Sequence, residues 1–172
     1  ASWASVDYEG RWKALHYYAK RFFAPVMVSC EEQNWMTAEA NMNREHFVYE
    51  KSIRLNVTNE TLEDKKVLVK WALRNADASV VKAEEREVTV SALSSVWLDK
   101  EEYPDVDVFG QYVSYEAWEG DTCISEGSVI FSYPKYFHYL DPQLSYRIEG
   151  DEIVVSAKAY AKGVEILNAS ED

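Results

Sequence analysis

The stretch Lys66-Val67-Leu68-Val69-Lys70-Trp71-Ala72-Leu73-Arg74 (residues 66–74) alternates large apolar side chains with cationic ones. Val67, Val69, Trp71 and Leu73 fall on one side of an extended chain, because successive side chains of a β-strand point to opposite faces. A strand with one apolar face and one charged face has one side in a core and the other in water. This stretch therefore predicts a strand of an antiparallel sheet.

The same alternation continues on both sides of this stretch, from residue 26 to residue 133. Its further apolar positions are Val26, Val28 and Cys30, then Ile53, Leu55 and Val57, then Val88, Val90, Val96 and Leu98, then Val113, Tyr115 and Ala117, and finally Val129 and Phe131. Turn residues bound the runs, as in Asn75-Ala76-Asp77 and Glu119-Gly120-Asp121, and no helical pattern separates them. About seven half-buried strands at this spacing predict a mainly β fold, an immunoglobulin-like β-sandwich over residues 26–133.

The first 25 residues have apolar side chains at helical spacing instead. They predict one helix over residues 9–23, with Asp7 as its N-cap and Pro25 as the residue that stops it. An exposed apolar stripe needs a cover, so we expect the helix to pack on the sandwich or on a second copy of the chain, as a homodimer. The stripe consists of Trp12, Leu15, Ala19, Phe22 and Phe23.

A second β segment is predicted after the sandwich, over residues 134–172. Residues 144–148 and 153–155 are apolar runs, and Glu149-Gly150-Asp151-Glu152 between them is typical of a hairpin turn. Residues 164–166 suggest a third strand. Three strands are too few for a core of their own, so we interpret this segment as the opening of a truncated β domain.

The charge of the chain argues against two classes of partner. Its 18 Lys and Arg against 30 Asp and Glu give a formal net charge of −12, which repels nucleic acid and anionic lipid. No apolar run is long enough to cross a bilayer, and the first residues lack the pattern of a signal peptide. Cys30 and Cys123 are too few for a disulfide framework and are interpreted as buried thiols, which favours the cytoplasm of a bacterium.

Neither a metal nor a cofactor is predicted. His16, His46 and His138 lie far apart in the sequence and have no ligand partner nearby. The acidic residues around Pro104 lack the glycine of a calcium-binding loop and are interpreted as a solvated loop. Glycine patterns that bind phosphate are absent as well.

The carboxylate pairs do not predict a hydrolase site within this chain. Hydrolysis of a glycoside needs two carboxyl groups in one site. The pairs Glu31-Glu32, Glu84-Glu85 and Glu101-Glu102 are adjacent in sequence, so on strands their side chains point to opposite faces.

Two further features allow more than one interpretation. Trp35, Trp97 and Trp118 are candidates for a sugar-stacking face, although core or inter-domain packing is preferred. Sequons at Asn56, Asn59 and Asn168 imply glycosylation only if the protein is eukaryotic and secreted.

The opening residues, Ala-Ser-Trp-Ala-Ser-Val-Asp-Tyr-Glu-Gly-Arg-Trp-Lys-Ala-Leu-His-Tyr-Tyr-Ala-Lys-Arg-Phe-Phe-Ala-Pro-Val (residues 1–26), resemble a segment of the β-mannosidases of glycoside hydrolase family 2. In that family this segment closes the catalytic barrel. Ser-Trp ends barrel strand 8, Gly-Arg-Trp-Lys-Ala-Leu begins the last barrel helix, and Phe-Phe-Ala-Pro-Val leads into the next domain. The family continues with an immunoglobulin-like sandwich and a smaller β domain, to which residues 59–71, 131–137 and 150–165 are similar.

The resemblance implies three parts, which are the end of the barrel (1–25), the sandwich (26–133) and the opening strands of a second β domain (134–172). It implies that the whole enzyme is a retaining β-mannosidase whose barrel binds the β-mannoside. The catalytic glutamates of the family lie in barrel strands 4 and 7, before residue 1. The resemblance therefore assigns no catalytic residue here and implies that the 172 residues alone are inactive. Only Trp3 corresponds to a substrate-binding position, a tryptophan that stacks on the terminal mannose.

The sandwich is expected to brace the barrel, and two alternatives stay open. The first is a free-standing carbohydrate-binding module, which predicts exposed, coplanar Trp or Tyr rings on one face of the sandwich. The second is an accessory domain of another family 2 hydrolase, such as a β-galactosidase.

Overall fold

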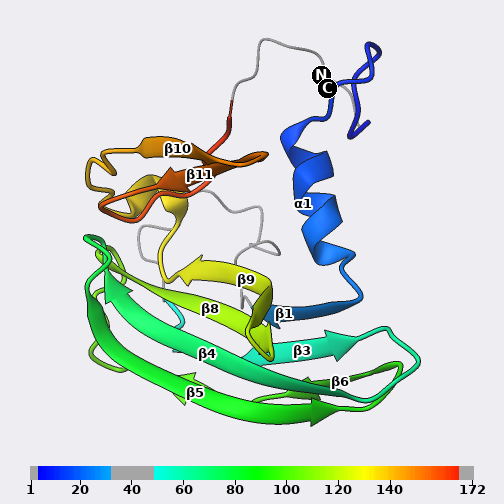
Figure 1. Cartoon of the computed structure of the whole chain (residues 1–172). Coiled ribbons are helices and arrows are strands. Elements are labelled where there is room, and N and C mark those ends of the chain that lie inside the picture. The colour runs from blue at the N-terminus through cyan, green and yellow to red at the C-terminus, as the bar shows by residue number, and fades with distance from the viewer. Residues whose placement is uncertain (1–3, 32–48, 167–172) are drawn as a thin grey trace.

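The structure is a computed structural model that describes residues 4–31 and 49–166 (Figure 1). The described elements are α1 (Ala14–Phe22), β1 (Val26–Cys30), β2 (Ser52–Ile53), β3 (Leu55–Asn59), β4 (Lys65–Asn75), β5 (Val80–Val90), β6 (Ser94–Trp97), β7 (Glu101–Glu102), β8 (Gln111–Glu119), β9 (Thr122–Ile130), the short 3-10 helix η1 (Pro134–Tyr136), β10 (Ser145–Glu149) and β11 (Glu152–Ser156). The mainly β fold class predicted from the sequence is confirmed.

Seven strands form the two main sheets. One sheet has the order β1-β3-β6 and the other has the order β5-β4-β8-β9, and all neighbouring strands are antiparallel. Strands β2 and β7 form a separate short antiparallel ladder. The segment 52–59 pairs with β7 up to Ile53 and with β1 and β6 from Leu55 onward. The two sheets lie face to face with β1 close to β9, which is the arrangement of a β-sandwich (Figure 1).

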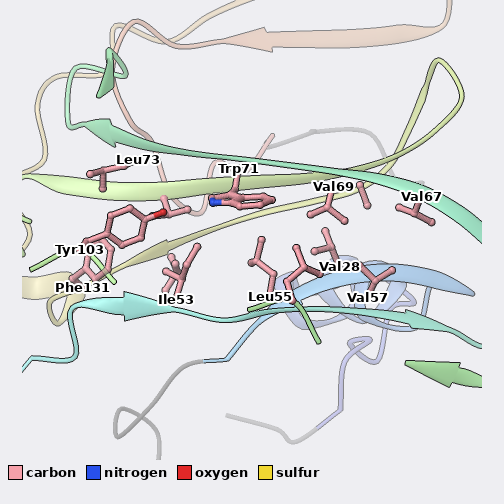
Figure 2. Close-up of a cluster of buried hydrophobic side chains, with 14 of the residues drawn as sticks. Val28, Ile53, Leu55, Val57, Val67, Val69, Trp71, Leu73, Tyr103 and Phe131 are labelled. Atoms are coloured by element: carbon pink, nitrogen blue, oxygen red, sulfur yellow. The ribbon is translucent and has the colours of Figure 1, made fainter. Parts of the chain in front are cut away.

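The core lies between the two sheets, and β4 supplies its centre. Val67, Val69, Trp71 and Leu73 are all buried, as the alternation in residues 66–74 predicts. Figure 2 shows them pointing toward Leu55 and Val57 of β3 in the opposite sheet and toward Ile53 of β2. Each such side chain contributes about 1.5–3 kcal/mol when it is fully buried, so this layer holds the sheets together.

Strand β5 is longer than the sequence suggests, because the predicted alternation of apolar side chains marks only its end, at Val88 and Val90. Lys82, Glu84 and Arg86 lie opposite Leu73, Trp71 and Val69, and therefore share the core side of the sheet. Lys82 pairs with Glu84 and Glu101, and Arg86 Nη1 lies 2.6 Å from Asp99 Oδ2. Inward charges on an edge strand discourage pairing with another chain.

The helix begins later than predicted, at Ala14 rather than residue 9, and Lys13 rather than Asp7 is its N-cap. Asp7 Oδ1 accepts hydrogen bonds from the backbone N–H of Glu9 and of Arg11, each at 2.9 Å. Gly10, at φ +87°, takes the left-handed conformation that this tight turn needs. Asp7 therefore stabilises a turn that precedes α1.

The C-terminal segment forms the predicted hairpin, β10 with β11, but no third strand. Residues 157–166 contain no strand, so the expectation for Val164 and Ile166 is wrong. The segment is attached to the sandwich through the Tyr160 ring, which stacks on Tyr112 of β8 at 3.9 Å between centroids. Ala76, Ile130 and Phe137 complete this small buried cluster.

Candidate functional site

The exposed surface of α1 is the first candidate for a functional surface. None of its residues is buried, and the side chains of Leu15 and Phe22 are 53% and 47% exposed. Figure 1 shows α1 rising from the start of β1 and directed away from the two sheets. The expectation that the stripe packs on this sandwich is therefore wrong, because the chain enters β1 at one end of the sandwich. Packing on a second copy stays a prediction.

The junction between α1 and the sandwich is held by hydrogen bonds. The carbonyl oxygen of Pro25 accepts a bond of 2.7 Å from the backbone N–H of Glu60. The next residue, Val26, pairs with Asn59 in the ladder of β1 and β3. The direction in which the chain leaves α1 is thus tied to the end of β3.

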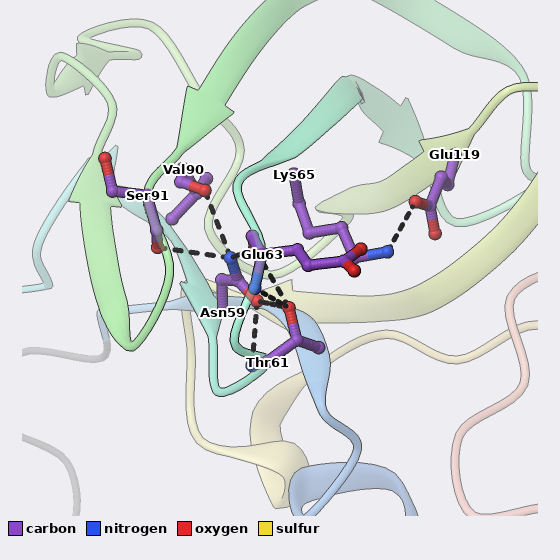
Figure 3. A network of polar contacts seen from close by, with 7 residues as sticks. All are labelled: Asn59, Thr61, Glu63, Lys65, Val90, Ser91 and Glu119. Atoms are coloured by element: carbon purple, nitrogen blue, oxygen red, sulfur yellow. Dashed lines mark hydrogen bonds and ion pairs between the residues drawn. The ribbon is translucent and has the colours of Figure 1, made fainter.

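Asn59 stabilises this end of the sandwich from inside (Figure 3). Its side chain is fully buried, and Nδ2 donates to the carbonyl oxygens of Glu63, Val90 and Ser91 at 2.8–3.1 Å. Its Oδ1 accepts from the backbone N–H and the hydroxyl of Thr61. One side chain therefore joins the β3–β4 turn to the end of β5, next to the residues that receive α1. The sequence shows Asn59 only as part of a turn and a sequon, and nothing in the pattern marks it as buried.

The structure also shows whether the two described sequon residues, Asn56 and Asn59, are accessible to a glycan. Asn59 uses both ends of its amide inside the protein, and the side chain of Asn56 is only 6% exposed. A glycan on either residue has no room in the folded sandwich. Asn168 lies outside the described residues.

The tryptophans do not form a common face. Trp97 lies on β6 and Trp118 on β8, so the two rings belong to different sheets, and Trp35 lies outside the described residues. Each ring is in contact with a cation, Arg54 Cζ at 5.0 Å from the Trp97 centroid and Lys70 Nζ at 4.9 Å from that of Trp118. The structure therefore shows no platform of coplanar Trp rings within its described part.

Hydrogen bonds lower the pKa of two described carboxyl groups. Hydrogen bonds from Lys100 and Ser52 lower the pKa of Glu50, and those from Ser79 lower the pKa of Asp77. A general acid needs the opposite shift, because it must hold its proton near neutral pH. Within residues 4–31 and 49–166, no three His, Cys, Asp or Glu side chains are arranged to bind a metal ion.

Two smaller predictions concern the thiols and the membrane. Cys30 and Cys123 form no disulfide among the described residues; Cys30 is half-buried while Cys123 is exposed, so the expected burial of Cys123 is wrong. Cys123 lies at the turn end of the β8–β9 hairpin, where the sheet no longer covers it. In the described part of the chain, no helix has the length and apolar character needed to cross a membrane.

Trp3, the one residue that the resemblance assigns to substrate binding, lies outside the described residues. Its role in stacking on a sugar stays a prediction. What the described residues do supply is a sandwich, a fixed junction at Pro25 and a helix with an uncovered apolar side.

These features define the class of the protein, an immunoglobulin-like β-sandwich domain with an attached helix. A family model described as "Mannosidase Ig/CBM-like domain" matches residues 51–136, which is half of the chain. The chain belongs to this family.

Comparisons with individual proteins agree with the family. The chain is 42% identical over 48 residues to the β-mannosidase of Mus musculus (26% of this chain, 6% of the mouse protein). It is 57% identical over 28 residues to β-mannosidase A of Aspergillus terreus (16% of this chain, 3% of the fungal protein). The matched stretches of the chain thus cover less than a tenth of the length of these relatives.

A solved structure shares the fold over almost the whole chain. The β-D-mannosidase from Dictyoglomus thermophilum aligns with a TM-score of 0.75 and 19% identity, over 92% of this chain and 18% of that enzyme. At this identity the likeness shows the fold.

Proposed function

We propose that this chain is a non-catalytic, C-terminal part of a retaining β-mannosidase that hydrolyses terminal β-D-mannosides. In this proposal the sandwich braces the catalytic barrel. The observation that carries it is the geometry of α1, whose apolar side is exposed while its end is tied to the sandwich through Pro25 and Glu60. The family match and the similarity to β-mannosidases supply the kind of enzyme.

The brace acts by fixing where the helix points. The apolar stripe of α1 gains about 1.5–3 kcal/mol for each large side chain that a barrel covers. Because the backbone after α1 is bonded to the end of β3, the sandwich and the helix move together. A barrel packed on the helix is then held in one position relative to the sandwich.

The chemistry belongs to the rest of the enzyme. In a retaining glycosidase one carboxylic acid protonates the leaving oxygen, and a second carboxylate forms a glycosyl ester that water hydrolyses. In the proposed enzyme both groups are glutamates of the barrel, upstream of residue 1. Several described carboxyl groups of this chain pair with lysine or arginine side chains instead, among them Glu50, Glu87, Asp99 and Glu119.

Assay of the purified 172 residues with an aryl β-mannoside tests the non-catalytic role. We expect no hydrolysis above the background of buffer. Release of the aryl group at a rate proportional to the concentration of the chain would overturn the proposal. The same helix and sandwich would also suit another family 2 hydrolase, and parallel assays of the intact enzyme with aryl β-mannoside and aryl β-galactoside separate the two substrates.

A further inference from the structure

A groove crosses the outer face of the four-stranded sheet, the face that points away from the core. Its volume is about 410 Å³. The floor is a row of small side chains that lie opposite one another in the ladders, Ala83 of β5, Ala72 of β4 and Ser114 of β8. Small side chains between rows of long ones leave a depression on the sheet.

Long polar side chains form the walls of this groove. On one side Glu85, Lys70 and Glu116 lie in register across the same three strands. On the other side Arg74 is held in place, with Nε donating to Ser114 Oγ at 2.9 Å and Nη1 donating to the carbonyl oxygen of Ala78 at 3.1 Å. The walls therefore offer donors and acceptors at fixed positions.

Trp118 helps keep the groove open without lining it. It lies on the outer face beyond the Lys70 row, and the ammonium of Lys70 lies 4.9 Å from the centroid of its ring. Its Nε1–H donates to Glu116 Oε2 at 2.8 Å. Both contacts hold wall side chains that line the groove, Lys70 and Glu116, in place.

The charges of the groove favour a neutral ligand with many hydroxyl groups. Glu85 and Glu116 repel an anion, and Lys70 and Arg74 repel a cation. An apolar ligand would remove water from these charges without replacing their hydrogen bonds, which is costly. A sugar satisfies both kinds of group, because each hydroxyl donates and accepts.

We propose that this groove binds a short β-mannooligosaccharide, about two sugar units long. The length follows from the three strands that the groove crosses, since neighbouring strands lie about 4.8 Å apart. The choice of mannose rests on the proposed function, whereas the choice of a neutral sugar rests on the groove itself. The domain would then hold part of the glycan outside the barrel, through hydrogen bonds rather than through stacking on an aromatic platform.

Titration of the isotopically labelled chain with mannobiose and mannotriose, followed by amide chemical shifts, tests this proposal. We expect saturable shifts at Ala72, Ala83 and Ser114 with an affinity in the millimolar range. Ala83→Phe fills the groove from an exposed position and should weaken binding about tenfold or more. Thr89→Phe is the matched control, because Thr89 is exposed and lies on the same face of β5, three rows away, and should leave binding within about twofold.

Lys70→Met provides a second variant that keeps the length of the side chain and removes its donor group. We expect it to weaken binding several-fold, and a dispersed amide spectrum shows that each variant is folded. An absence of shifts, shifts confined to the Trp97 side of the sandwich, or equal responses to maltotriose would overturn the proposal. Because the titration uses the chain alone, its failure leaves the bracing role of the sandwich untouched.

Discussion

The amide of Asn59 has both of its ends in hydrogen bonds inside the protein, with Nδ2 facing three carbonyl oxygens. Asn59→Ala leaves these buried acceptors and the Thr61 N–H without that partner, which costs about 1–3 kcal/mol for each group that water cannot reach. We expect the free energy of unfolding to fall by about 2–4 kcal/mol, measured by urea denaturation.

Asn56 is the matched control for this change, since it is a buried amide on the same strand. Among the described residues its Nδ2 finds no acceptor, and its Oδ1 accepts from the hydroxyl of Thr58 at 2.9 Å. Asn56→Ala should cost about 1 kcal/mol or less. Equal losses in the free energy of unfolding for the two variants would show that the hydrogen bonds of Asn59 stabilise the fold no more than the contacts of Asn56 do.

Ionisation of the buried Tyr160 phenol makes the free energy of unfolding depend on pH in the alkaline range. Burial raises its pKa to about 12, although the hydrogen bond with Ser128 works in the other direction. An unfolded tyrosine ionises near pH 10. The contribution of Tyr160 to the free energy of unfolding is therefore fully present below about pH 10 and is lost as the pH rises from about 10 to about 12. Its size is on the order of 2 kcal/mol.

Tyr160→Phe should make the loss of stability above about pH 10 shallower, because one buried phenol no longer ionises on unfolding. Near neutral pH the variant loses the Ser128 bond and about 1 kcal/mol. Urea midpoints between about pH 8 and pH 12 measure both effects. Tyr146→Phe is the control, since that ring is largely exposed. An unchanged alkaline slope for Tyr160→Phe would contradict this account.

At the scale of elements, the sequence predicts those strands whose inner and outer faces differ in polarity. Residues 66–74 alternate clearly, and β4 lies at the centre of its sheet. Strand β5 is predicted only at Val88 and Val90, because its inward positions carry charges that pair with Asp99 and Glu101. Such pairings join segments that are distant along the chain, and no local pattern reports them.

The start of α1 shows the same limit on a smaller scale. Asp7 has the right composition for an N-cap, but its carboxylate is used by the turn that includes Gly10. A helix N-terminus and this turn are alternative partners for the Asp7 carboxylate, and the spacing of apolar residues does not decide between them. The groove on the outer sheet is hidden for a related reason, because only the register places Ala83, Ala72 and Ser114 in one row.

The apolar side of α1 leads to a prediction about association. Replacing Leu15 and Phe22 together by Gln removes exposed apolar area and breaks no buried contact. We expect the thermal stability of the isolated chain to change by about 0.5 kcal/mol or less. We also expect self-association at high concentration to weaken, as followed by sedimentation equilibrium.

Val69→Ala provides the contrast, because Val69 is fully buried in the core. It should lower stability by about 1–3 kcal/mol and leave association unchanged. A large loss of stability in the Leu15 and Phe22 variant would mean that the stripe is covered within a single chain.

At the scale of the whole molecule, the described part of the chain is a sandwich that carries exposed apolar surfaces outside its core. The sandwich is closed by its own core, whereas α1 and the apolar face of the β10–β11 hairpin, with Tyr146 and Ile148, are exposed. The sequence could predict the sandwich and the enzyme family that it resembles. It could not predict where α1 points, because that direction depends on the hydrogen bond between Pro25 and Glu60.

The most direct test of the central claim is immunoprecipitation of the natural protein from its source, with an antibody raised against this chain. The precipitate is assayed for β-mannosidase activity and its mass is read on an immunoblot. The proposed function predicts β-mannosidase activity in the precipitate and a band several-fold heavier than 19.9 kDa. A band near 19.9 kDa in a precipitate without that activity would contradict it and would mean that the domain works on its own.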